Sequence, residues 1–74
     1  MGGITKKILN ELWNETEEST WDSLLSNLDD IHEFNVITTD QWGKLNYAFK
    51  QLKSLDEHFP DSVGELAVLL EYYL

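Results

Sequence analysis

The sequence predicts an all-α protein, a compact four-helix domain in which most neighbouring helices run antiparallel. Three observations lead to this fold class. Apolar residues recur at helical spacing in four segments, capping residues and one proline mark the ends of these segments, and the connections between them are short. At 74 residues, with 42% hydrophobic content, the chain has enough apolar bulk for one small core.

The first predicted helix covers residues 4–16. Its apolar side chains fall on one half of a helix, and they are Ile4, Ile8, Leu9, Leu12 and Trp13. Acidic residues then follow closely at Glu15, Glu17 and Glu18. Because negative charge is unfavourable near the C-terminal end of a helix, we expect the helix to end in this stretch.

The second predicted helix covers residues 20–33, with Ser19 or Thr20 as its N-cap. Its apolar face consists of Trp21, Leu24, Leu25, Leu28 and Ile31. The opposite side carries a stripe of carboxylates, formed by Asp22, Asp29, Asp30 and Glu33. This acidic stripe is the sharpest charge pattern in the sequence, and it is either a recognition surface or a solvated outer face.

The third predicted helix covers residues 39–59 and is the longest. Thr38 and Gln41 have the spacing of a capping box, and Pro60 is expected to end the helix because the residue before a proline avoids the helical region. Its buried face comprises Trp42, Leu45, Ala48, Phe49, Leu52, Leu55 and Phe59. The preceding residues 34–38 are too apolar for an ordinary loop, so we predict a connector that buries Phe34 and Ile37.

The fourth predicted helix covers residues 62–73, and Ser62 and Glu65 again have capping-box spacing. This helix is apolar nearly all round, with Val68 and Tyr72 projecting away from the main apolar face. A small domain cannot easily enclose such a helix on every side. We therefore predict that residues 63–74 mediate self-association as a homodimer, or contact a partner.

The charge balance restricts the classes of partner. Fourteen acidic residues oppose five lysines, and the formal net charge is −9. Such a surface repels nucleic-acid phosphates and anionic membranes but attracts basic proteins. We therefore expect a basic protein partner, and neither direct nucleic-acid binding nor membrane binding. The absence of cysteine excludes disulfides and thiolate zinc sites, and it fits the cytoplasmic location that we expect.

No residue pattern predicts catalysis or a bound cofactor. His32 is expected at the edge of the apolar face of the second helix, and His58 in the last turn of the third, where positive charge suits the helix dipole. Asp29 combined with His32 or with Glu33 offers two metal ligands, which do not make a site. We therefore expect a non-enzymatic protein without metal or cofactor.

Asp22, Ser23 and Leu24 form a short string that resembles the Asp-Ser-Leu signature of acyl and peptidyl carrier proteins, which are acidic, mostly helical and of similar length. In that family the serine at the start of the second helix carries a phosphopantetheine arm. The resemblance implies that Ser23 is the modified residue. The chain departs from this family in two ways. In carrier proteins the helix and loop before the modified serine are longer than the segment before Ser23. In this chain, moreover, Trp21 stands directly before the motif.

The function predicted from the sequence is a small, acidic, non-catalytic protein-binding module. Its predicted contact residues combine acidic side chains with two tyrosines outside the apolar helix faces, and they are Glu15, Glu17, Glu18, Asp22, Asp29, Asp30, Glu33, Tyr47 and Tyr72. Tyrosine supplies contact area at low entropic cost, and carboxylates steer a basic partner. By analogy of charge and size, such modules act as inhibitors, immunity or antitoxin-type proteins, or mimics of DNA.

Overall fold

The computed structural model describes residues 6–73, and these residues form four α-helices and no strand. The helices are α1 (Lys6–Glu15), α2 (Trp21–Glu33), α3 (Thr39–Ser54) and α4 (Val63–Glu71). The predicted all-α fold class is confirmed. Residues 4 and 5 of the first predicted helix lie outside the described part of the chain. Within residues 6–73, no helix is both long enough and apolar enough to cross a membrane.

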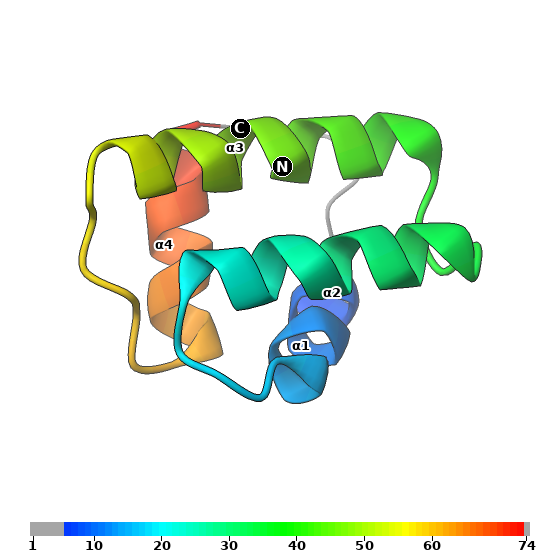
Figure 1. Ribbon diagram of the computed structural model, residues 1–74, viewed down its shortest axis with the longest axis horizontal. Coiled ribbons are helices and arrows are strands. Elements are labelled where there is room, and N and C mark those ends of the chain that lie inside the picture. Colours follow the sequence, from blue (N-terminus) through cyan, green and yellow to red (C-terminus); the bar gives the residue numbers. More distant parts are fainter. Residues whose placement is uncertain (1–5, 74) are drawn as a thin grey trace.

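Helices α2 and α3 form the main packing unit of the fold. Figure 1 shows them lying side by side and running in opposite directions, whereas α4 crosses them at a steep angle. Helix α1 contacts both α2 and α4. The α2–α3 pair therefore has the predicted antiparallel arrangement, and α1 links this pair to the C-terminal helix.

The core is apolar and draws on all four helices, as the helical spacing predicted. Phe49 of α3 is its largest fully buried side chain. The buried hydrophobic residues are Leu9, Leu12, Trp21, Leu24, Leu28, Ile31, Ile37, Leu45, Ala48, Phe49, Leu52, Leu66 and Leu70. Among residues 6–73, no polar or charged residue is buried. The polar side chains of these residues therefore lie at or near the surface.

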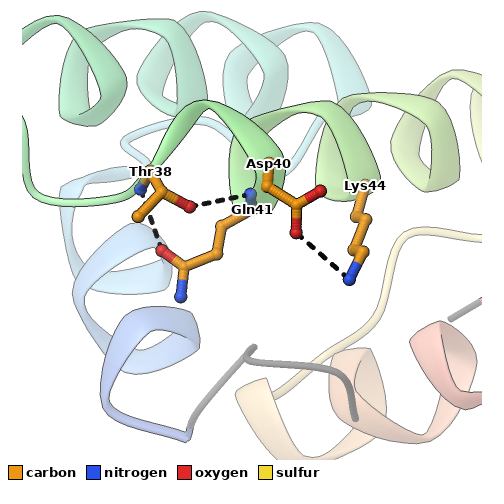
Figure 2. Close-up of polar contacts among 4 residues, drawn as sticks. All are labelled: Thr38, Asp40, Gln41 and Lys44. Carbon is orange, nitrogen blue, oxygen red and sulfur yellow. Dashed lines mark hydrogen bonds and ion pairs between the residues drawn. The ribbon is translucent and has the colours of Figure 1, made fainter.

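A complete capping box begins α3 (Figure 2). The Gln41 N–H donates to Thr38 Oγ1 at 3.1 Å, and the Thr38 N–H donates to Gln41 Oε1 at 2.9 Å. Asp40 in the first turn pairs with Lys44 at 3.2 Å. These bonds satisfy backbone donors that a helix start leaves open, and the acidic side chain suits the helix dipole. The predicted start of this helix is confirmed.

The other two observed N-caps are also side chains that the sequence suggested. Thr20, and not Ser19, caps α2 by accepting from the Ser23 N–H at 3.2 Å. Ser62 caps α4 by accepting from the Glu65 N–H at 3.3 Å. The Glu65 carboxylate accepts from the Asp61 N–H at 2.9 Å, so the reciprocal bond falls one residue before the expected position.

Helix α3 ends at Ser54, which makes the predicted range 39–59 five residues too long. The chain turns at Asp56, whose φ of 54° lies in the left-handed region. The Asp56 N–H donates to Lys53 O and the Glu57 N–H to Leu52 O, both at 3.0 Å. This is a Schellman motif, which closes a helix without glycine here because aspartate tolerates the left-handed conformation. Pro60 therefore does not end the helix.

Residues 55–62 connect α3 to α4 and are held by aromatic side chains. The ring centroid of Phe59 lies 5.7 Å from that of Trp13 and 5.0 Å from that of Trp21. The Trp21 Nε1–H donates to Glu57 O at 2.8 Å. A continuing helix would carry Phe59 along the α3 axis, whereas the observed turn brings it onto α1 and α2.

Two apolar residues that the sequence predicts to be buried are exposed. They are Phe34, with 78% of its surface accessible, and Leu55, with 62%. Each is the C-cap residue that immediately precedes a left-handed residue, Asn35 or Asp56. Ile37 is buried as predicted. The left-handed turns thus place both C-cap side chains outside the core. His58 also lies in the connection after α3 and not in the last helical turn.

Replacing Asp56 by Gly should raise the free energy of unfolding by up to about 1 kcal/mol, because glycine adopts the left-handed conformation without the steric cost that any Cβ brings. Urea denaturation followed by circular dichroism measures this change. Asp56→Val serves as the contrasting variant and should lower stability. If Asp56→Gly proved less stable than the wild type, the left-handed turn would not be the end of α3.

Candidate functional site

A groove between α1, α2 and the connection to α3 has a volume of about 270 Å³. We call it the α1/α2 groove. It is lined by Glu11, Glu15, Asn27, Asp30, Ile31, Phe34 and Val36. Three of these side chains are carboxylates, three are apolar, and none is a lysine or histidine. The groove therefore combines negative charge with an accessible apolar surface.

The carboxylates of the groove come from two helices. Glu11 and Glu15 lie four residues apart on α1, a spacing that puts both on one face of the helix. Asp30 comes from α2. All three residues are exposed. Of the predicted contact residues, the structure brings together Glu15 and Asp30, which are fifteen positions apart in the sequence.

Asn27 ties the two helices together beside these carboxylates. Its Nδ2 donates to Glu15 O at 3.1 Å and to Thr16 Oγ1 at 3.3 Å. Thr16 Oγ1 in turn donates to Leu12 O at 2.8 Å. Because Glu15 and the following residue, Thr16, accept from the Asn27 amide group, its remaining polar atom, Oδ1, can only accept.

The apolar end of the groove is built by the C-terminal turn of α2. Asn35 has a φ of 62°, and its N–H donates to His32 O at 3.0 Å. The Val36 N–H donates to Ile31 O at 2.9 Å. This Schellman motif fixes the backbone on both sides of Phe34, and Phe34 and Val36 are exposed where they line the groove.

The predicted acidic stripe of α2 is divided between two flanks of the helix. Asp30 lines the α1/α2 groove, whereas Asp22 forms an ion pair with Lys53 of α3. Asp29 accepts a hydrogen bond at 2.8 Å from Nε1 of Trp42, which is also on α3. The fourth member, Glu33, is exposed in the last position of α2. Asp22 and Asp29 thus contact α3, while Asp30 faces the α1 side.

The other predicted contact residues lie elsewhere on the surface. Glu17 and Glu18 are in the α1–α2 connection, where Glu18 lines a smaller hollow of about 130 Å³. Tyr47 is exposed as predicted, but it lines a separate hollow of about 390 Å³ together with Tyr73. Tyr72, which is 81% accessible, caps the C-terminal end of α4. Tyr47 therefore does not line the same groove as Asp30.

The residues considered for chemistry and modification also have defined positions. His32 stacks on Trp42 with ring centroids 5.0 Å apart, and its Nε2 lies 3.1 Å from Thr39 Oγ1. Ser23 lies in the first turn of α2 and is half-buried. Within the described part of the chain, no group of three or more potential ligand residues could hold a metal ion.

Helix α4 has apolar side chains on both its buried and its exposed side, as its sequence suggests. Leu66 and Leu70 are fully buried, whereas Val68 and Tyr72 are exposed. Leu74, at the end of the segment considered for a homodimer, lies outside the described residues.

Sequence reasoning missed Glu11, Phe34 and Val36 as members of the groove. Glu11 had a usable signal, since it lies one helical turn before Glu15 on the same face. The exposure of Phe34 depends on the left-handed conformation of Asn35, a residue type enriched in that region.

No family model, curated protein or solved structure matches the chain.

Proposed function

We propose that this protein is a non-catalytic binding module that captures a basic segment of a partner protein in the α1/α2 groove. The observation that supports this proposal is the composition of the groove. It presents three carboxylates beside the accessible apolar side chains of Phe34 and Val36. A segment with lysine or arginine next to an apolar residue would complement both halves.

The charge of the whole chain supports the same class of partner. A formal net charge of −9 creates a field that attracts a basic protein and speeds its association at low ionic strength. The groove then supplies local specificity. Phe34 is exposed and does not fill the core, so its phenyl ring can contact a side chain of the partner. Aromatic anchors of this kind carry much of the free energy of binding in protein interfaces.

Several biological roles fit a module that covers a basic surface. Small acidic inhibitors, immunity or antitoxin-type proteins and DNA mimics can act in this way, and we propose a role of this class for the present chain by analogy of charge and size. The ion pair of Asp22 and the hydrogen bond of Asp29 engage these two residues with α3. The contact residues that we propose are the charged and the exposed apolar side chains that line the α1/α2 groove, namely Glu11, Glu15, Asp30, Phe34 and Val36.

The test compares two double variants that remove equal charge. Glu15→Gln/Asp30→Asn changes the groove, and Asp56→Asn/Glu71→Gln changes acidic residues that do not line it. Isothermal titration measures the affinity of each variant for a synthetic peptide in which lysines flank a single leucine. The groove variant should bind about three- to tenfold more weakly than the control variant, the range expected for the loss of two exposed charge pairs. Affinity for the wild type should fall as ionic strength rises.

Equal affinities of the two double variants would show that only net charge matters, and they would contradict the assignment of the groove. Affinity independent of ionic strength would contradict capture by charge. The carrier alternative has its own test, which is the intact mass of the protein after incubation with a phosphopantetheinyl transferase. A mass increase that disappears in Ser23→Ala would favour a carrier over a binding module.

A further inference from the structure

We infer that the α1/α2 groove selects arginine, and that the guanidinium of one partner arginine binds against the groove carboxylates and the ring of Phe34. This inference deepens the proposed function and rests on it. It names the side chain that the groove accepts and separates arginine from lysine, which net charge alone cannot do.

The polar side chains of the groove present hydrogen-bond acceptors. Glu11, Glu15 and Asp30 are carboxylates, which only accept when ionised. The Asn27 amide group already donates to Glu15 O and Thr16 Oγ1, so its Oδ1 adds another acceptor. A ligand that matches this surface must be rich in donors and lack acceptors. A guanidinium carries more N–H donors than an ammonium, and neither has an acceptor.

The apolar side of the groove distinguishes between the two cations. Phe34 is an exposed aromatic residue with 78% of its surface accessible, and its backbone is held by the turn at Asn35. A planar guanidinium stacks on an aromatic face and is less strongly hydrated than an ammonium, so it loses less on leaving water. The methylene stem of the arginine would then cover Val36, since long cationic side chains bury their stems along apolar surface.

The size of the groove fits one side chain. Its volume of about 270 Å³ lies just below the range of about 300 to 1,000 Å³ that is usual for pockets enclosing a whole small-molecule ligand. The groove therefore has room for a single long side chain presented by a partner segment.

The experiment uses the full chain and one short capped peptide with a variable central residue beside a leucine. Four versions carry arginine, lysine, citrulline or norleucine at that position, and titration calorimetry measures each affinity. The arginine peptide should bind up to about fivefold more tightly than the lysine peptide, because a full exposed cation–π contact sets the upper limit and the planar guanidinium stacks better on the ring than an ammonium does. Citrulline keeps the shape of arginine without its charge, and it should bind no better than norleucine.

Two variants place the effect on the groove. Phe34→Leu should remove the preference for arginine over lysine while leaving the thermal midpoint unchanged, because the residue is exposed. Tyr72→Leu is the matched control, since it removes an equally accessible aromatic ring on α4, and it should retain the preference.

The outcomes separate this inference from the proposed function. Equal affinity of the wild type for the arginine and lysine peptides would overturn arginine selection and leave capture of basic segments intact. A preference for arginine that survives in Phe34→Leu would overturn the placement of the guanidinium on Phe34. Failure of both peptides to bind at low ionic strength would overturn the proposed function itself.

Discussion

Replacement of Phe49 by Ala should lower the free energy of unfolding by about 3 to 5 kcal/mol, the range measured when a large buried aromatic residue is truncated. Phe49 is fully buried in the middle of α3, and its ring centroid lies 6.2 Å from that of Trp21 on α2. The variant would leave a cavity between the two helices that form the main packing unit. The free energy of unfolding of a typical domain is about 5 to 15 kcal/mol, so the expected loss is a large share of it.

Urea denaturation followed by circular dichroism at the helical band measures this loss. Phe34→Ala is the matched control, because it removes the same side chain from an exposed site and should change stability by less than about 0.5 kcal/mol. Similar stabilities for Phe49→Ala and the wild type would mean that the core is not centred on α3.

Replacement of Trp21 by Ala should have an effect of similar size, about 3 to 5 kcal/mol, and it should also weaken the connection after α3. Trp21 is buried at the start of α2, where its ring contacts Phe49 and Phe59 and its Nε1–H donates to Glu57 O. Truncation therefore removes core volume and also releases residues 55–62. We expect faster limited proteolysis within these residues than in Phe49→Ala at equal global stability.

Trp21→Phe separates the two contributions of this residue. It keeps an aromatic ring in the core but loses the bond to Glu57 O, and it should cost clearly less than Trp21→Ala. The lost bond alone is worth about 0.5 to 1.5 kcal/mol. If Trp21→Ala left the protease sensitivity of residues 55–62 unchanged, the tryptophan would not be what holds the connection after α3.

Helical spacing and capping residues are local properties, and they predicted the four helices and the buried faces well. The predicted end of α3 was wrong because the local signal for it is ambiguous. Asp56 adopts a left-handed conformation that aspartate tolerates and does not require, so its residue type alone does not mark the end of a helix. Pro60 offered a clearer stop signal four residues later, and the prediction followed it.

The groove could be predicted only in part, because it depends on how the helices are rotated against one another. The sequence shows that Asp22, Asp29 and Asp30 share one side of α2. It does not show that α3 contacts Asp22 and Asp29 while α1 lies beside Asp30. The hydrogen bonds from Asn27 to the end of α1 are also tertiary contacts, and no local sequence pattern predicts them.

The positions of the tryptophans determine which optical signals the protein offers. Trp13 and Trp21 both contact Phe59, and Trp42 stacks on His32 between α2 and α3. None of the three lines the α1/α2 groove. Intrinsic fluorescence should therefore follow folding and the docking of residues 55–62, and a ligand in the groove would leave the emission spectrum nearly unchanged.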